Sequence, residues 1–449
     1  MISSAELASL EAKLCDFNAS NRKLALKEFH AQFSSGKLEA KPATQEHNMH
    51  CHSFFSYNGY GFSPSRIACW ARREGLFAAG LVDFDVLDGV DEFIAAAKIL
   101  DLRFSCGIET RVFIPELAAH EINSPGEPGI AYHTGVGFSS SAIPEQERKF
   151  LGGLKNNAAA RTRFIVDRVN PFLAPASIDF EREVLSLTPS GNATERHVCA
   201  AYEKKAAALF PELSKRAAFW AEKLGLTALD AEKTVKDSVK LQGLIRAKTM
   251  KSGGPGYVKA DPKSFPALLD FNAFVRKSGA IPTIAWLNGE SSGEADIKRL
   301  FEIHEAAGAA AINIIPDRNW DFPDPAVRDK KVRELHRIIN AAKERSLPII
   351  VGTEMNAPGQ KFIDGFSAEP LMPFLNDFID GAAIMFAHTL LEPMGLGYLS
   401  DWAAAEFSSR PAKNKFFAAF GRNTTPVGFS QKRLEITKES LHRQAIAMA

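Results

Sequence analysis

Cysteine is scarce in this chain, and the few cysteines present have no metal-binding or redox spacing. The 449 residues contain five cysteines, an odd number, and they form no C-x-x-C motif. This usage argues against a disulfide framework and against a thiolate zinc site, and it is typical of free thiols in a reducing compartment. We therefore expect a cytoplasmic protein. The five residues are Cys15, Cys51, Cys69, Cys106 and Cys199.

Long apolar runs and an excess of one charge are also missing. Stretches such as "AAAINIIP" are far shorter than a membrane span, and the N-terminus reads as an amphipathic helix instead of a signal peptide. The 54 basic and 53 acidic residues give a net charge of +1, which offers no general attraction to nucleic acid. We expect neither a membrane nor a nucleic acid as partner, and the oligomeric state stays open.

A further absence is the G-x-G-x-x-G motif, which follows none of the expected strands and so argues against a dinucleotide-binding fold. The chain instead alternates short apolar runs with helix-like stretches. Seven such runs predict an α/β fold with a parallel sheet, either a closed barrel or an open doubly wound sheet. The expected strands are residues 47–54, 77–85, 103–114, 130–138, 280–286, 310–317 and 347–355.

The pattern changes twice along the chain. Between the fourth and fifth expected strands lies a long stretch of helical sequence, which we interpret as an insertion into the α/β fold. The expected divisions are a helical leader (1–45), the first part of the barrel (46–143), the helical insertion (144–278), the second part of the barrel (279–400) and a helical tail (401–449).

Three of the 11 histidines fall within residues 47–52. Because side chains alternate between the faces of a strand, His50 and His52 share one face and His47 points to the other. Two imidazoles aimed at one point predict a metal site. The alternative is a buried, hydrogen-bonded histidine pair.

Other ionisable residues stand in or at the ends of the remaining strands. They are Asp83, Glu109, His133, Asp317 and Glu354. In βα barrels the carboxyl ends of the strands meet at one rim, where imidazole and carboxylate groups would form a site for Zn²⁺, Mn²⁺ or Fe²⁺. Each residue also has a structural interpretation: Glu109 could pair with a neighbouring arginine, and Asp83 could cap the next helix.

Four motifs resemble those of the polymerase and histidinol phosphatase (PHP) family. They are "NMHCHSFFSYNGYGFSP", "GLVDFDVLDGVDEFIAAAK", "GIETRVF" and "AYHTGVGF". The resemblance covers residues 46–140 well and residues 280–360 more loosely. It implies a distorted, TIM-like barrel of seven βα units that holds two or three divalent metals and usually hydrolyses phosphoesters.

The resemblance also implies a set of metal ligands. His50 and His52 match the family's H-x-H motif, Glu109 its bridging glutamate and His133 its fourth-motif histidine. Glu354 stands where the family has its final aspartate.

The chain departs from the family pattern at the remaining ligand positions. Tyr57 or Asn58 replaces an aspartate, and Phe84, Trp286 and Asn356 replace histidines. The resemblance therefore implies about one tightly held divalent metal per chain, with at most a weak second one near Glu109 and His133.

From these residues we expect a metal-dependent hydrolase, in particular a phosphoesterase that acts on a small phosphorylated substrate through a metal-activated water. Asp317 or Asp83 would be the general base. Arg318, or Lys251 and Lys259 around a glycine-rich loop, would hold the phosphate. The alternative for Arg318 is an ion pair with a nearby aspartate. The alternative for the whole chain is a non-hydrolytic PHP descendant, either a metal-dependent lyase or isomerase or an inactive ligand-binding domain.

Overall fold

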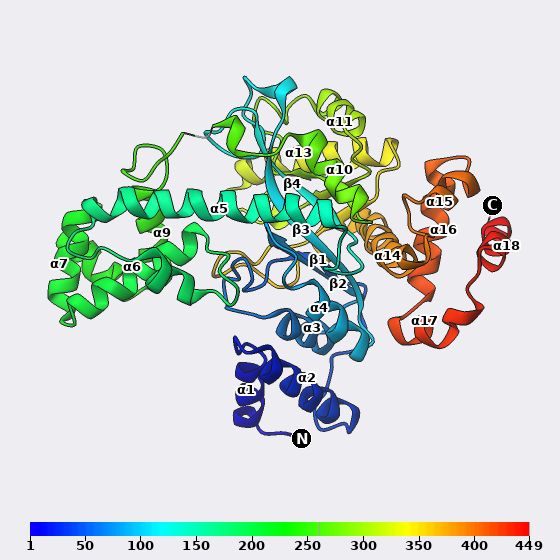
Figure 1. Cartoon of the computed structure of the whole chain (residues 1–449), viewed down its shortest axis with the longest axis horizontal. Coiled ribbons are helices and arrows are strands. Elements are labelled where there is room, and N and C mark those ends of the chain that lie inside the picture. Colours follow the sequence, from blue (N-terminus) through cyan, green and yellow to red (C-terminus); the bar gives the residue numbers. More distant parts are fainter. Residues whose placement is uncertain (260, 449) are drawn as a thin grey trace.

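The computed structural model describes residues 1–259 and 261–448. Its centre is a seven-stranded sheet whose strands lie side by side in chain order. The strands are β1 (His47–Cys51), β2 (Ala78–Phe84), β3 (Arg103–Phe113), β4 (Ile130–Val136), β5 (Ile281–Trp286), β6 (Ala311–Ile314) and β7 (Ile349–Val351). A bridge between Cys51 and Glu354 joins the segment after β7 to β1, so the sheet is a nearly closed barrel (Figure 1). The α/β class and the seven strands expected from the sequence are confirmed.

Strand β4 breaks the parallel arrangement that the sequence predicted. It pairs antiparallel with both β3 and β5, whereas the other neighbouring strands pair in parallel. The expectation of a wholly parallel sheet was wrong because residues 114–129, between β3 and β4, form turns and a short 3-10 segment instead of a crossover helix. The carboxyl end of β4 therefore lies at the opposite rim from those of its neighbours.

The seam between β1 and the segment after β7 depends on a glycine. The Glu354 N–H donates to the His50 carbonyl at 2.8 Å, and the His52 N–H donates to the Glu354 carbonyl at 2.7 Å. A Cβ atom at Gly352 would lie 2.4 Å from the His50 nitrogen, so a larger residue would push the two segments apart. Gly352 thus allows the chain to bring Glu354 beside the two histidines.

Helices surround the barrel and bury the strands. At the start of α3 the Ser63 hydroxyl accepts a hydrogen bond from the Arg66 N–H, and Pro64 takes the first helical position. The surrounding helices are α3 (Pro64–Arg73), α4 (Val90–Ile99), α10 (Leu268–Lys277), α11 (Ile297–Ala306), α12 (Asp317–Trp320), α13 (Pro325–Glu344) and α14 (Leu375–Leu391). Because buried strands read as apolar runs, the polar residues within them are conspicuous in the sequence.

Between β4 and β5 the chain forms a group of helices that we call the helical lobe. It comprises α5 (Glu145–Phe172), α6 (Glu195–Leu209), α7 (Leu213–Leu224), α8 (Ala228–Thr234) and α9 (Ser238–Thr249). Its apolar side chains, among them Tyr202 and Trp220, form a cluster separate from the core of the barrel. Helix α5 extends from the barrel into the lobe (Figure 1).

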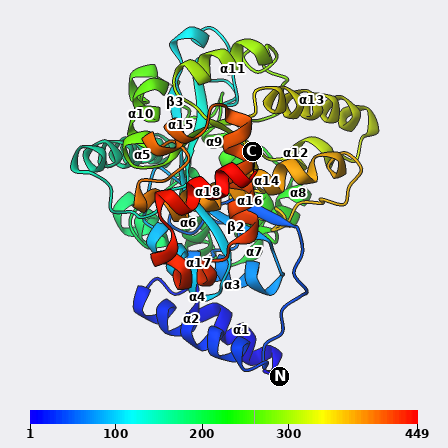
Figure 2. The same cartoon turned by 90° about the vertical axis from the view of Figure 1, so that its right-hand side faces the viewer.

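Both ends of the chain are helical and pack on the barrel helices. The N-terminal pair, α1 (Ser4–Lys13) and α2 (Ala19–Ser34), lies below α3 (Figures 1 and 2). The C-terminal helices are α15 (Asp401–Glu406), α16 (Arg410–Asn423), α17 (Pro426–Lys432) and α18 (Lys438–Met448), and α16 packs on α14. Short 3-10 or π turns lie at Pro115–Leu117, Phe180–Val184, Leu185–Leu187, Pro262–Ser264, Met372–Phe374, Glu392–Met394 and Arg433–Glu435.

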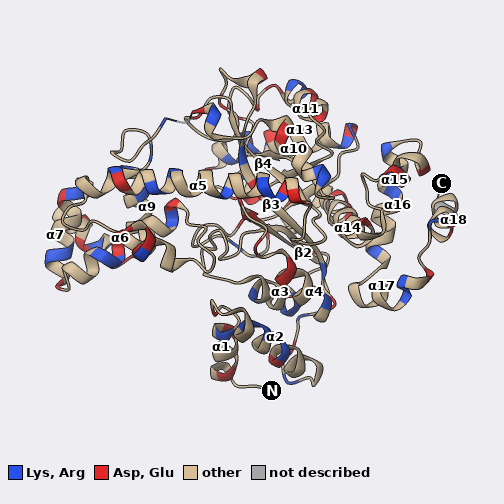
Figure 3. Ribbon diagram, viewed as in Figure 1, with Lys and Arg blue, Asp and Glu red and all other residues tan. Residues whose placement is uncertain are grey.

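Acidic and basic residues are interspersed over the helices, consistent with the near-zero net charge (Figure 3). Within residues 1–259 and 261–448, no helix combines the length and the apolar character that crossing a membrane requires.

Candidate metal centre

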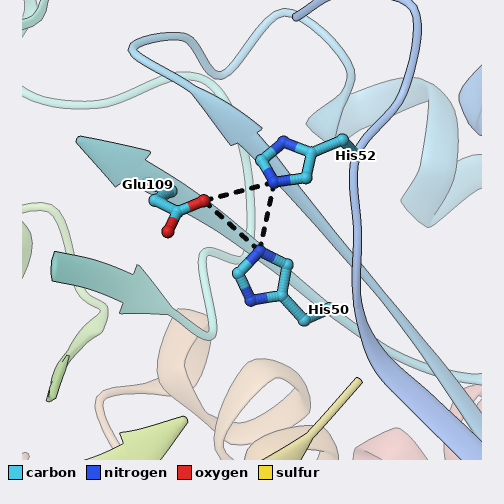
Figure 4. Close-up of side chains that lie close together, drawn as sticks. All are labelled: His50, His52 and Glu109. Atoms are coloured by element: carbon cyan, nitrogen blue, oxygen red, sulfur yellow. Dashed lines mark hydrogen bonds and ion pairs between the residues drawn. The ribbon is translucent and has the colours of Figure 1, made fainter. Parts of the chain in front are cut away.

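Three buried side chains converge inside the barrel: His50 and His52, at the end of β1, and Glu109, on β3. Glu109 Oε2 lies 3.5 Å from His50 Nε2 and 3.2 Å from His52 Nε2, and the two nitrogens are 3.3 Å apart (Figure 4). His47 points to the other face, as the alternation of the strand predicts, and stacks on Phe366.

The orientation of His52 is fixed from behind by a chain of hydrogen bonds. The Ser56 hydroxyl donates to Asp83 Oδ1 at 2.6 Å and lies 3.2 Å from His52 Nδ1. With its proton given to Asp83, Ser56 can only accept, so Nδ1 of His52 carries the ring proton. The Nε2 lone pair therefore faces Glu109 and His50. Carboxylates that act through a second residue in this way commonly orient metal-binding histidines.

The ring of His50 is fixed by Asn313 on β6, whose amide lies 2.9 Å from His50 Nδ1. The amide nitrogen Nδ2 of Asn313 faces Nδ1, and this contact orients the ring so that Nε2 points to the centre. Burial would raise the pKa of the Glu109 carboxyl, but the two facing imidazoles outweigh it and lower this pKa. Burial would lower the pKa of His50, and the charges of Glu109 and Glu354 raise it instead.

The three residues fit a divalent metal. Glu109 Oε2 is buried without a hydrogen-bond partner among the described residues, which is costly for a carboxylate oxygen unless a cation compensates it. The candidate ligand atoms of the three side chains all lie within 4.8 Å of one another. Two imidazole nitrogens and one carboxylate oxygen are donors that Zn²⁺, Mn²⁺ and Fe²⁺ accept.

Glu354 lies beside this cluster, but its carboxylate is engaged elsewhere. It forms an ion pair with Arg318 and accepts a hydrogen bond from Asn356 Nδ2 at 2.6 Å. Arg318 does not pair with a nearby aspartate, because Asp321 pairs with Lys361 and Asp324 caps α13.

His133 is not brought to the cluster. Thr134, not His133, is the neighbour of Glu109 across the β3–β4 pair, so His133 points to the other face of the sheet. There its Nε2 lies 2.7 Å from Asn272 Oδ1, its ring stacks on His304, and burial lowers its pKa to about 4. The resemblance implied that His133 is a metal ligand, but its side chain points away from the cluster. We therefore do not retain His133 as a ligand.

The two aspartates expected as general bases differ in their surroundings. Asp83 accepts hydrogen bonds from Ser53 and Ser56, is fully buried and supports His52. Asp317 begins α12, next to Arg318. Burial, followed by the nearby Asp364 carboxyl, raises the pKa of Asp317 to about 7.

The residues that depart from the family pattern do not offer ligands to the cluster. The Phe84 ring stacks on His52 with 4.2 Å between centroids. Tyr57 packs against His197, and the Asn58 amide donates to the His52 carbonyl and so holds the loop. Trp286 is buried, and Asn356 binds Glu354.

A cavity of about 420 Å³ adjoins the cluster and reaches the helical lobe. Its volume is in the range of small-molecule sites. Glu109, Asn313 and Glu354 contribute to its wall on the barrel side. The basic residues of the wall are Arg111, Arg161, Arg196, Arg246, Lys251 and Arg318.

Sequence reasoning found some of these cavity residues and missed others. Lys251 belongs to the wall and pairs with Glu195 at 2.8 Å, whereas Lys259 lies outside it. The amides of Gly254 and Gly256 are used within their own loop, which is therefore a turn. Asn313 was missed, although a polar residue inside an apolar strand is a usable signal.

No protein-family model matches the chain, and no curated protein matches it significantly. The solved structures that are similar to it include two hydrolase-like proteins. One is an amidohydrolase from Chromobacterium violaceum, with bound sulfate and no metal, at 18% identity and a TM-score of 0.48, covering 74% of this chain and 95% of the other. The second is described as a candidate metal-dependent phosphoesterase from Bifidobacterium adolescentis, at 16% identity and a TM-score of 0.45, covering 75% and 98%. Neither likeness is strong enough to assign an activity.

Proposed function

We propose that this chain is a metal-dependent hydrolase with a PHP-like barrel and that it cleaves a phosphoester of a small substrate. The observation that carries the proposal is the buried cluster of His50, His52 and Glu109 beside a cavity rich in arginine. The three residues stand at positions that the PHP resemblance gives to metal ligands, and they are drawn together from two separate strands.

His50, His52 and Glu109 would hold the metal. A divalent metal supplies a water of lowered pKa and a Lewis acid for a phosphoryl oxygen. Asn313 and the Ser56–Asp83 pair keep the two imidazoles directed at the centre, which limits the reorganisation that metal binding requires.

Arg318 is the residue best placed to bind the phosphoryl group. Its guanidinium lies at the cavity wall and is held by Glu354, which Asn356 supports in turn. A planar guanidinium can donate two parallel hydrogen bonds to one phosphate. Arg318 would thus supply a fixed cation to the same cavity as the metal.

For proton transfer we propose Asp317. A base with a pKa of about 7 is suited to catalysis at neutral pH. Asp317 precedes Arg318 in the chain and is not among the residues that line the cavity, so the Asp317→Asn variant tests its role directly.

The test combines elemental analysis with a panel of phosphomonoesters and phosphodiesters. We expect about one equivalent of metal per chain and turnover with Mn²⁺ or Zn²⁺ that chelation abolishes. Full activity after thorough chelation would contradict the mechanism. Metal binding without turnover across the panel would favour the non-hydrolytic alternative, a lyase, an isomerase or a ligand-binding domain.

A further inference from the structure

The cavity has a second wall that the metal centre does not require. This wall comes from the helical lobe, which is docked on the barrel through Asn192. Its amide donates to the carbonyl of Phe55, after β1, and to that of Phe84, at the end of β2, at 3.1 and 2.8 Å. The lobe is thereby fixed over the same loops that hold the metal centre.

The lobe contributes an excess of cations to this wall. Arg246 and Lys251 share one carboxylate, Glu195, at 2.7 and 2.8 Å. Arg161, on α5, and Arg196, on α6, make no ion pair and no side-chain hydrogen bond within residues 1–259 and 261–448. The lobe therefore contributes four cations but only one carboxylate to the cavity wall.

On the barrel side the wall carries Asp85, Glu109 and Glu354, and within the described residues none of these forms an ion pair with a cation of the lobe. Asp85 also borders the cavity, but it accepts a hydrogen bond from Thr110 at 2.5 Å and forms no ion pair with Arg161 in the described chain. Arg111 is paired with Glu127, which lies outside the wall. Like charges gathered at a partly buried surface repel one another, and an anionic ligand would relieve that repulsion.

The side chain of Arg161 is held in place without using its donors. Its guanidinium lies over the ring of Phe265, 5.4 Å from the centroid, and Arg111 lies over the same ring at 4.8 Å. A guanidinium carries five N–H donors, and those of Arg161 have no hydrogen-bond or ion-pair partner among the described residues. Arg161 is thus preorganised to bind an oxyanion.

Aromatic side chains line the same cavity. Tyr57, Phe84 and Tyr132 are part of its wall, together with Phe265 and Trp286. Such surfaces pack against the carbon skeleton of an organic molecule, whereas a single inorganic ion would leave them uncovered.

We infer that the substrate carries two separated anionic groups: the ester phosphate at the metal centre, and a second oxyanion, phosphate or carboxylate, held by Arg161 and Arg196 of the helical lobe. This inference rests on the proposed function for the first group only. The second site belongs to the lobe and binds its anion whether or not the first group is hydrolysed.

The test uses three propyl compounds that differ at one end: propyl phosphate, 3-phosphooxypropanoate and propane-1,3-diol bisphosphate. Homologues with longer carbon chains are included to match the distance between the two anion sites. Their binding to the full-length protein is measured by calorimetry, with and without metal. The variants are Arg161→Met and Arg196→Met, singly and combined. Arg163→Met is the matched control, because Arg163 is an exposed residue of the same helix that pairs with Glu181.

We expect the two compounds that carry a second anionic group to bind wild type more tightly than propyl phosphate does. The double variant should bind these two compounds about 10- to 100-fold more weakly than wild type does, as expected for the loss of hydrogen bonds to charged groups. Propyl phosphate binding, and every affinity of the Arg163 control, should stay unchanged. Arg161→Lys with Arg196→Lys should restore part of the loss and so exclude misfolding as its cause.

The outcomes separate the two hypotheses. Equal affinity of wild type and double variant for all three compounds would overturn the second site, even if all three are hydrolysed. Conversely, selective binding of the compounds with two anionic groups, without any hydrolysis, would contradict the proposed function and support the site. Whether phosphate or carboxylate binds better identifies the second group.

Discussion

Replacing Ser56 by alanine tests how the metal centre is built. The Ser56 hydroxyl is the link between His52 Nδ1, at 3.2 Å, and Asp83, at 2.6 Å. Its removal leaves a buried ring N–H without an acceptor, which costs about 1–3 kcal/mol. Because that hydrogen bond directs the opposite nitrogen to the metal, much of the cost should appear as weaker metal binding. We expect a loss of affinity of about 5- to 100-fold, in the range of outer-shell substitutions.

The assay is competition for Zn²⁺ or Mn²⁺ against a chromophoric chelator at fixed pH. Ser105→Ala is the matched control, since Ser105 is a buried serine on β3 whose hydroxyl has no hydrogen-bond partner among the described residues. The control should bind metal as wild type does. An unchanged affinity of Ser56→Ala, or an equal loss in both variants, would refute the view that Ser56 and Asp83 orient His52.

Three further predictions concern single side chains. Glu109→Gln should abolish metal binding in a folded protein, whereas His133→Gln should retain the metal and lose only thermal stability; loss of metal in both would return His133 to the ligand set. Asp317→Asn should retain the metal and lower turnover by about 10²–10⁴-fold if Asp317 is a general base, and the rise of activity through pH 7 that its raised pKa predicts should disappear. His388 has a pKa lowered to about 4 by burial, from 6.5 when unfolded, so its stabilising contribution is complete above about pH 6.5 and is lost as the pH falls toward 4. The destabilisation caused by His388→Gln should therefore shrink by about 1.4 kcal/mol per pH unit below pH 6.5 in urea melts, and a pH-independent difference would refute the assigned burial effect.

The sequence was sufficient for the part of the site that depends on local geometry. Two histidines at alternate positions of one strand must share a face. A glutamate inside another strand of the same barrel points either into the barrel or toward the surrounding helices. For this reason the meeting of His50 and His52 with Glu109 could be predicted before any tertiary contact was known.

The prediction for His133 failed because the register of β4 against β3 sets Thr134, and not His133, beside Glu109, and the expected direction of β4 was wrong as well. A parallel β4 would have placed its carboxyl end at the metal rim. The segment between β3 and β4 contains "NSPGEPG", a sequence typical of turns and not of a crossover helix. That signal was available, and it should have favoured an antiparallel return.

Other contacts join residues too distant in the chain for sequence patterns to connect. Arg318 pairs with Glu354, 36 positions further on, in preference to two aspartates close by. The cavity cations Arg161 and Arg196 reach the site only because the helical lobe docks on the barrel, and the buried amide of Asn192 is one of the contacts that hold it there. Neither the pairing of Arg318 with Glu354 nor the docking of the lobe produces a periodic pattern in the sequence.

The pairing of Arg318 with Glu354 bears on how many metals the protein needs. The PHP resemblance assigns a metal-binding carboxylate to the position of Glu354, and here a guanidinium carried by the chain neutralises that carboxylate. Phe84 covers the ring of His52 where the same resemblance assigns another imidazole. A second ion would have to displace Arg318 and would still find few ligands to offset its dehydration. We therefore infer that this fixed cation takes over part of the charge that a further metal would supply, which agrees with the proposal of about one metal per chain. It follows that chelation should remove only part of the positive charge at the site. The chelated protein should still bind phosphate, but more weakly than the metal-loaded protein does.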